Sequence, residues 1–107
     1  MSNELVALVT CPPEKAEEIA EALVESKLAA CVNIVAGITS IYRWQGQINK
    51  DPEFLLIIKT SRKVYDALEK KLKEVHPYDV PELICLPIEA GSKAYLEWMN
   101  QSIECVG

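Results

Sequence analysis

The sequence predicts a mixed α+β domain with the element order β-α-β-β-α-β and one further helix toward the C-terminus. Short apolar runs bounded by proline and glycine are typical of strands, whereas apolar residues spaced three and four apart are typical of helices with one buried face. Both patterns alternate along this chain. Half of the 107 residues are hydrophobic and a quarter are charged, which fits one globular domain over residues 1–107.

The first strand and the first helix are predicted within residues 5–28. The nearly continuous apolar run at residues 5–10 is typical of a strand that is covered on both faces. Pro12 and Pro13 end this strand, and helical spacing begins after Glu14. The apolar positions of the helix are Ala16, Ile19, Ala20, Leu23, Val24 and Leu28. We therefore expect a helix with one buried stripe.

A long hairpin is predicted next. Residues 29–35 begin its first strand, Ala36 and Gly37 interrupt the strand as a β-bulge would, and residues 39–44 resume β-prone chemistry. These residues form the outgoing arm of the hairpin.

The return arm follows a turn at Gln45 and Gly46. Residues 49–52 are expected to break this arm before the apolar run at residues 54–60. Pro52 within the arm indicates an exposed edge or a bulge, because proline cannot donate a hydrogen bond to a neighbouring strand.

The second half of the chain predicts a helix, a strand and a final helix. Ser61 is a good N-cap, and His76-Pro77 ends the helix. Its apolar stripe consists of Val64, Ala67, Leu68, Leu72 and Val75. Asp66 with Lys70 and Glu69 with Lys73 are predicted i, i+4 ion pairs. Residues 83–88 form the last predicted strand, and residues 91–103 lead into and form the third helix. This order is the split βαβ, ferredoxin-like arrangement.

The length of the hairpin predicts an oligomer. Each arm has about 14 residues, or roughly 45 Å at the rise of a strand, whereas strands usually have five or six residues. A long apolar edge that stays open promotes aggregation. We therefore expect the excess length to pair with a neighbouring subunit in a closed homo-oligomeric ring.

Composition argues against several classes of protein. The net charge is −5, and the one dense basic run, residues 70–73, lies on a predicted helix that also carries Asp66, Glu69 and Glu74, which disfavours a nucleic-acid partner. We expect no signal peptide, because residues 1–4 carry no positive side chain and the apolar run after them is short, and no segment approaches membrane-spanning length. The cysteines lack C-x-x-C spacing, so we expect reduced thiols in a cytoplasmic protein without membrane partners. They are Cys11, Cys31, Cys85 and Cys105.

No catalysis is expected. The sequence contains no Ser-His-Asp order and no nucleophile elbow. Its glycines form neither a G-x-G-x-x-G pattern nor a P-loop, so no phosphate-binding loop is indicated.

His76 is the only histidine, and it opens the proline-containing stretch 76–82. An imidazole can bind a soft metal or change its charge near neutral pH. A second interpretation is that His76 caps the last turn of its helix, where the ring meets the carbonyl end of the helix dipole. Cys11 precedes two prolines at the start of a helix, where the dipole would lower the pKa of its thiol and favour a thiolate. Cys11 is otherwise a simple N-terminal helix position.

Other residues are candidates for a cleft between subunits or for packing. The polar candidates for the cleft wall are Tyr42, Lys59 and Tyr78. The acidic candidates for a hard cation are Glu53, Asp79 and Glu82. Trp44 and Trp98 are expected to be interface anchors, and Cys31 and Cys85 are expected to be small core residues.

Four segments together resemble the CutA family of divalent-cation tolerance proteins, and the resemblance covers nearly the whole chain. They are residues 28–34, 41–48, 56–60 and 76–82. The resemblance implies a PII-like trimer of ferredoxin-like subunits with hairpins that extend between subunits. It also implies a role in tolerance to copper and other divalent metals.

The family resemblance implies a metal site as well. A bacterial member binds copper through a cysteine at the end of the first strand and two adjacent histidines. In this chain Cys11 lies one position beyond that cysteine, where Thr10 aligns, and His76 has Val75 in place of its histidine neighbour. Because threefold symmetry brings side chains of neighbouring subunits together, we predict Cys11, His76 and Glu82 as ligands of copper or another divalent metal.

Three functions are compatible with these expectations. The first is a homotrimeric divalent-metal-binding protein that acts in tolerance and response to metal ions. The alternative is a PII-like regulatory trimer that binds a small metabolite or a partner protein in its subunit clefts, and this alternative rests on analogy between folds. A scaffold that anchors a partner protein is a third, simpler possibility.

Overall fold

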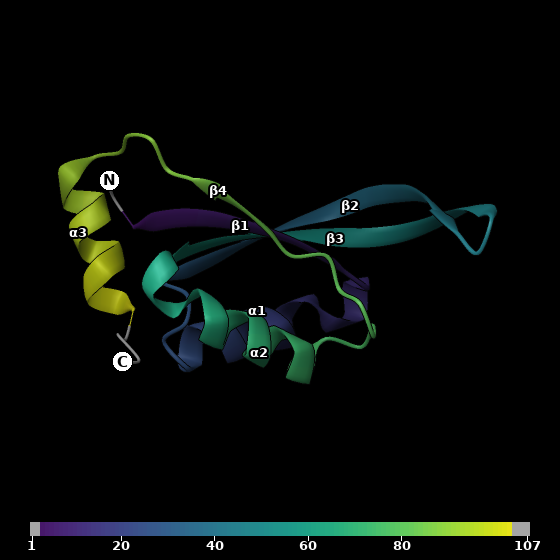
Figure 1. Cartoon of the computed structure of the whole chain (residues 1–107), viewed down its shortest axis with the longest axis horizontal. Helices are drawn as coiled ribbons and strands as arrows, with labels where there is room; N and C mark the ends of the chain where they lie inside the picture. The colour runs from purple at the N-terminus through teal and green to yellow at the C-terminus, as the bar shows by residue number, and fades with distance from the viewer. Residues whose placement is uncertain (1–2, 104–107) are drawn as a thin grey trace.

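The computed structural model describes residues 3–103 and has the predicted α+β architecture (Figure 1). Its strands are β1 (Glu4–Cys11), β2 (Cys31–Trp44), β3 (Gln47–Ser61) and β4 (Ile84–Pro87). Its α-helices are α1 (Ala16–Glu25), α2 (Tyr65–Val75) and α3 (Lys93–Ser102). Short 3-10 helices precede the first two: η1 (Pro13–Lys15) and η2 (Arg62–Val64). Cys105 lies outside the described residues.

The described strands form one antiparallel sheet in the order β2-β3-β1-β4. Strand β1 lies between β3 and β4, so that Ala7 is opposite Ile58 on one side and Cys85 on the other. Each βαβ unit therefore has its two parallel strands separated by a strand of the other unit. The predicted ferredoxin-like arrangement is confirmed.

Helices α1 and α2 cover one face of the sheet and enclose the core (Figure 1). In β1 the odd-numbered residues from Leu5 to Cys11 are buried, because alternate side chains of a strand point to the same face. The buried core also contains Ile19, Leu23, Leu56, Ile58, Leu68 and Leu72. Val24 and Cys31 were both predicted as core positions, but neither belongs to this core. Val24 is 42% exposed, because it turns toward a surface groove beside β2.

The hairpin of β2 and β3 extends beyond the rest of the sheet as a two-stranded arm (Figure 1). Strand β1 pairs with β3 only as far as Cys11 opposite Phe54, whereas β2 and β3 remain paired up to their turn. The two strands have 14 and 15 residues, which confirms the predicted length. The predicted break at residues 49–52 is wrong, because pairing with β2 carries β3 through them. Pro52 lies beyond the end of β1, on an exposed edge as expected.

Residues with positive φ shape the arm at two places. Ala36 and Gly37 of β2 together oppose the single residue Phe54 of β3, and Gly37 has a φ of +76°. The turn contains Gln45 with φ +50° and Gly46 with φ +78°, the backbone signs of a type I′ turn. The predicted bulge and the predicted turn are both confirmed.

Local interactions around α2 match the sequence in part. The Ser61 hydroxyl accepts a hydrogen bond from the backbone N–H two residues later, at 3.2 Å, as expected for an N-cap. Glu69 and Lys73 form the predicted ion pair at 3.9 Å. Within residues 3–103, the predicted pair of Asp66 and Lys70 does not form. An exposed pair of this kind contributes little to stability, because water solvates both charges.

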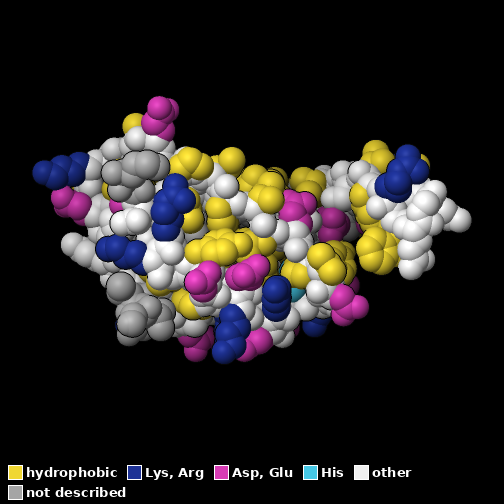
Figure 2. All heavy atoms as spheres, in the orientation of Figure 1, with side chains coloured by type: hydrophobic (Ala, Val, Ile, Leu, Met, Phe, Trp, Pro, Cys, Tyr) yellow, Lys and Arg dark blue, Asp and Glu magenta, His cyan; other side chains and the backbone are white. Residues whose placement is uncertain are grey.

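The second face of the sheet is covered by α3 at one end only (Figure 1). There the Asn100 side chain donates a hydrogen bond to the Glu4 carboxylate at 2.8 Å. The rest of this open face carries the side chains of Val6, Leu8, Val35, Leu55, Ile57, Ile84 and Leu86, which are exposed or partly exposed. Figure 2 shows hydrophobic side chains gathered along the strands. Apolar surface of this extent is typical of an interaction site.

Among residues 3–103, no helix combines the length and the apolar composition needed to cross a membrane.

Replacing Gly37 with alanine should destabilise the protein by about 1–2 kcal/mol. The cause is backbone strain at a φ of +76°, since no atom of residues 3–103 other than those of its two chain neighbours lies within 4 Å of the added methyl group. The test is the midpoint of urea unfolding at a fixed protein concentration. Ala36→Ser is the matched control in the same bulge, because Ala36 does not have a positive φ, and it should change stability by less than about 0.5 kcal/mol. Equal midpoints for Gly37→Ala and the wild type would contradict the prediction.

Candidate functional site

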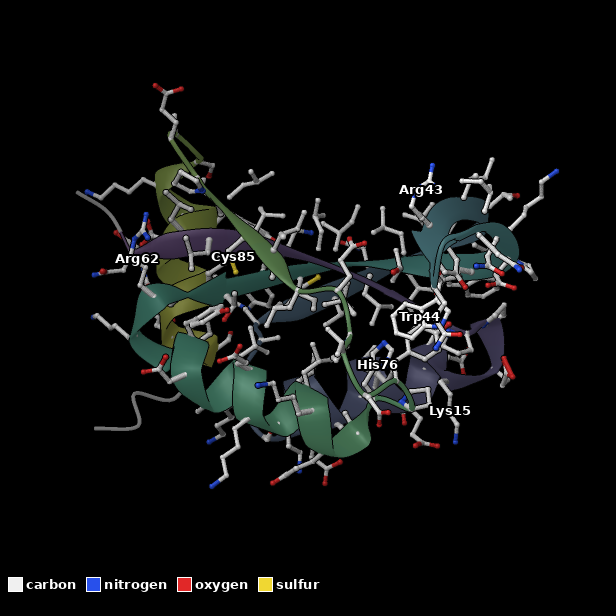
Figure 3. The ribbon with its side chains drawn as sticks, turned by 45° about the vertical axis from the view of Figure 1, so that its right-hand side comes forward. Lys15, Arg43, Trp44, Arg62, His76 and Cys85 are labelled. Carbon is white, nitrogen blue, oxygen red and sulfur yellow. The ribbon has the colours of Figure 1, made fainter. Side chains whose placement is uncertain are left out.

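The stretch between α2 and β4 passes the end of β1 at the base of the arm. Two hydrogen bonds place it there, one from His76 to the end of β1 and one from Tyr78 to β3. Figure 3 shows Trp44 of the arm pointing toward this stretch, whereas Arg43 points to the opposite side. Residues far apart in the sequence are thereby brought together at one end of the sheet.

His76 is buried, with 6% of its surface exposed, and both of its ring nitrogens have backbone partners. The Nδ1 atom accepts a hydrogen bond from the N–H of Tyr78 at 3.1 Å. The Nε2 atom therefore carries the ring proton and donates it to the carbonyl of Thr10 at 2.9 Å. The predicted helix-capping role of the ring is wrong, because the backbone N–H of His76, not its ring, bonds the helix carbonyl of Leu72.

Tyr78 joins this stretch to β3. Its hydroxyl donates a hydrogen bond to Glu53 Oε2 at 2.9 Å, and its ring packs against His76 with 4.7 Å between centroids. Burial and the bond to Glu53 raise the pKa of Tyr78 well above its ordinary range. The hydroxyl consequently remains a hydrogen-bond donor at neutral pH. Glu53 itself is only 6% exposed.

A cavity of about 570 Å³ lies between the arm and this stretch. Its walls contain Thr10, Ser40, Ile41, Tyr42, Trp44, Glu53, Tyr78, Asp79, Val80 and Glu82. The Tyr42 hydroxyl donates a hydrogen bond to the Asp51 carboxylate. This bond is the main reason why the pKa of Tyr42 is raised. A place in a cleft between subunits stays a prediction, but within the subunit Tyr42 and Tyr78 both line this cavity. Lys59 does not, because its ammonium group bonds Asn33 on the sheet.

Cys11 is the last residue of β1 and is fully buried in the core. Burial, with the nearby carboxylates of Glu53 and Glu14, raises the pKa of the Cys11 thiol to about 11. The thiolate expected from a helix dipole is therefore wrong. Enclosure in apolar surroundings and two negative charges outweigh any effect of the following helix.

The predicted ligands Cys11, His76 and Glu82 lie around the same end of the sheet but are oriented differently. Cys11 points into the core, His76 is bound to the backbone, and Glu82 is exposed at the cavity. Within residues 3–103, no group of three or more His, Cys, Asp or Glu side chains is arranged to hold a metal ion.

Glu53 has a larger role than its sequence context suggests. It was expected only as one of several acidic candidates, yet it is the buried acid of the cavity and bonds Tyr78. The sequence feature that points to a special role for Glu53 is its position between Pro52 and the apolar run at residues 54–58. A carboxylate at the start of such a run is unusual, because a charged group there is close to becoming buried.

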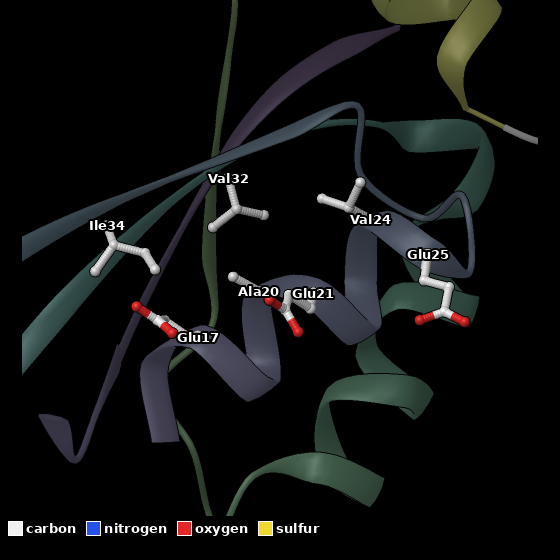
Figure 4. Close-up of a pocket in the computed structure, with 7 residues that line it drawn as sticks. All are labelled: Glu17, Ala20, Glu21, Val24, Glu25, Val32 and Ile34. Carbon is white, nitrogen blue, oxygen red and sulfur yellow. The ribbon is translucent and has the colours of Figure 1, made fainter. Parts of the chain in front are cut away.

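A second cavity, of about 480 Å³, lies between α1 and β2 (Figure 4). Glu17, Glu21 and Glu25 follow one side of α1, and the apolar wall is formed by Ala20, Val24, Val32 and Ile34. It shares no lining residue with the first cavity, and none of the predicted ligands lines it.

The burial of Cys11 predicts a pH dependence of stability. Because folding raises the pKa of this thiol from 9.0 to about 11, the unfolded chain loses its proton first as pH rises. The contribution of Cys11 is therefore present below pH 9 and is lost as pH rises toward 11. We expect the difference in free energy of unfolding between the wild type and Cys11→Ala to decrease between pH 8 and pH 11. A difference that stays constant in denaturant titrations would contradict the burial of this thiol.

Comparisons with known proteins agree with the resemblance in the sequence. The sequence pattern of the family described as CutA1 divalent ion tolerance protein matches residues 5–102 of this chain. A divalent-cation tolerance protein CutA from Thermus thermophilus is 51% identical over 100 residues, which cover 92% of this chain and 97% of the relative. Human protein CutA is 52% identical over 101 residues, which cover 94% of this chain but 56% of the relative. The chain thus spans little more than half of the mammalian protein.

Solved structures give the same result for the fold. The divalent cation tolerance protein Cut A1 of Thermus thermophilus has a TM-score of 0.92 at 50% identity, covering 94% of this chain and 99% of the other. CutA1 from Oryza sativa has a TM-score of 0.93 at 47% identity, covering 96% and 95%. The fold is therefore the PII-like fold of these proteins, and the chain belongs to the CutA1 divalent ion tolerance family.

Proposed function

We propose that this protein acts in the cytoplasm as a homotrimer that binds copper or another divalent metal and thereby supports tolerance and response to metal ions. The observation that carries the proposal is the family match over residues 5–102, since relatives at about half identity are named divalent-cation tolerance proteins. Those names describe tolerance and no reaction, so we propose a binding role without catalysis. The free thiols of Cys11, Cys31 and Cys85 are compatible with a reducing compartment.

The proposed trimer has two supports in the subunit. The arm projects beyond β1, and its Ile48, which is not part of the cavity lining, is 64% exposed. The open face of the sheet adds the exposed Ile84 and Leu86 of β4. Burial of both surfaces in one assembly removes apolar area from water and protects the edges of the sheet.

Metal binding through Cys11, His76 and Glu82 stays a prediction. In the subunit, the hydrogen bonds of His76 and the burial of Cys11 both have to change before these residues can bind an ion. A histidine binds a metal through a nitrogen lone pair, and in His76 the Nδ1 lone pair accepts a hydrogen bond while Nε2 carries a proton. One of these bonds has to open before the ring can bind an ion. The Cys11 thiol has to lose its proton and become accessible. We therefore propose that metal binding is coupled to a movement of the stretch at His76.

The cavity favours a second function. A volume of about 570 Å³ is within the range of small-molecule sites, roughly 300–1,000 Å³. Its residues come from β1, β2, β3 and the stretch before β4. A bound metabolite would therefore contact both the arm and the α2–β4 connection. This arrangement supports the alternative proposal of a PII-like regulatory trimer.

The mass of the protein in solution tests the oligomer. Light scattering after size exclusion should give three times the chain mass of 11.9 kDa at micromolar concentration. The physical reason is the exposed apolar area of the arm and of the open face. A mass equal to one chain would exclude the trimer, whatever the result of metal titrations.

Competitive titrations with copper(I) and copper(II) test metal binding in the reduced protein. We expect saturation at a whole number of ions per trimer and an affinity about tenfold or more lower in Cys11→Ala and His76→Ala, because each variant removes a ligand. Cys85→Ala is the matched control, since Cys85 is a partly buried thiol elsewhere in the sheet. Equal affinity in all four proteins would exclude these ligands and make metal tolerance an indirect effect.

A further inference from the structure

The cavity beside the arm has walls of two kinds. Carboxylates of Glu53, Asp79 and Glu82 line it together with the rings of Tyr42, Trp44 and Tyr78, and no lysine or arginine of residues 3–103 belongs to the lining. Such a wall attracts positive charge through its carboxylates and through the electron-rich faces of its rings. We propose that this cavity binds a small organic cation, an amine with one or more ammonium groups on an apolar carbon chain. The inference rests on the second function above, since it names the chemical class of the metabolite.

The strongest observation is the position of Glu53. Glu53 is 6% exposed, and its Oε2 atom accepts a hydrogen bond from the Tyr78 hydroxyl. Within residues 3–103, the ion pairs join Lys15 to Glu18 and Glu69 to Lys73, so none neutralises Glu53. A buried carboxylate is costly unless a positive partner compensates for its lost hydration. An ammonium group in the cavity would be that partner.

The aromatic wall is held in place before any ligand arrives. Tyr42 and Tyr78 donate their hydroxyl protons to Asp51 and Glu53, so each ring is fixed at its outer end by a carboxylate. The phenols therefore offer ring faces to the cavity and have no proton left to donate to a ligand anion. Trp44 adds the ring type that interacts best with cations.

The size of the cavity separates an organic cation from a bare metal ion. Divalent ions need several ligand atoms within about 2.0–2.6 Å. The described carboxylates and His76 do not form such a group. A volume of about 570 Å³ is instead sufficient for a chain of several carbon atoms between charged ends. Its apolar part can contact Ile41 and Val80 of the lining.

The test uses 1,4-diaminobutane as the probe and 1,4-butanediol as its neutral counterpart, with EDTA present to remove metal ions. The protein is the assembled full chain carrying Trp98→Phe, so that Trp44 is its only tryptophan. We expect saturable binding of the diamine in calorimetry, with a matching change in Trp44 fluorescence, and no saturation with the diol. Glu53→Gln should lower the affinity about tenfold or more, because it removes a charge-assisted hydrogen bond.

Two further variants make the result specific. Glu82→Gln removes a carboxylate from the exposed rim of the cavity without touching the buried bond to Tyr78, and it should also weaken diamine binding. Glu21→Gln is the matched control, because it makes the same change of charge in the groove beside α1. Its diamine affinity should equal that of the parent protein.

The possible outcomes separate this inference from the functions on which it builds. Absence of diamine saturation, or equal affinity in the parent, Glu53→Gln and Glu82→Gln, overturns the organic-cation site. Saturation by the diol in the same cavity also overturns it, but leaves a small-molecule site in place. Copper titrations without EDTA are scored separately, so a loss of metal binding does not affect the result with the diamine.

Discussion

The difference in length between β1 and β3 determines where the candidate site lies. β1 has eight residues and stops at Cys11 opposite Phe54, whereas β3 has fifteen and continues with β2 as the arm. Beyond that point only β2 and β3 continue, as a two-stranded hairpin. The chain leaving α2 passes through the space that β1 leaves open, and the cavity forms between this chain and the arm. A longer β1 would fill this space with another paired strand.

Within this arrangement His76 acts first as a structural link. Its ring joins the carbonyl of Thr10 to the N–H of Tyr78, and it thereby holds Tyr78 where the phenol can reach Glu53. Both buried ring nitrogens are satisfied, which is the stable state for polar groups removed from water. Metal binding at either ring nitrogen would break one of the two hydrogen bonds that hold the stretch in this position. A metal-dependent change in the wall of the cavity is therefore a direct consequence of any metal binding at His76.

The secondary structure followed from the sequence where local patterns were strong. Apolar periodicity predicted α1 and α2, and glycine at positive φ marked both the bulge at Gly37 and the turn at Gly46. The predicted break at residues 49–52 failed because polar residues and proline are tolerated in an exposed two-stranded arm, where no third strand needs their outer hydrogen bonds. Val24 failed as a core residue because its side chain, although within α1, turns toward the groove beside β2 and not toward the core.

The sequence by itself determined the order of the elements, the long hairpin and the residues whose side chains can bind a ligand or ionise, because these depend on local spacing and residue type. Four matching segments also determined the family. Only the tertiary structure decided how those residues are used. Cys11 became a core thiol with a raised pKa, and Glu53 became the buried acid of a cavity. Burial, charge and hydrogen bonding arise from contacts between distant segments, such as the contact of Tyr78 with Glu53, and no local pattern contains them.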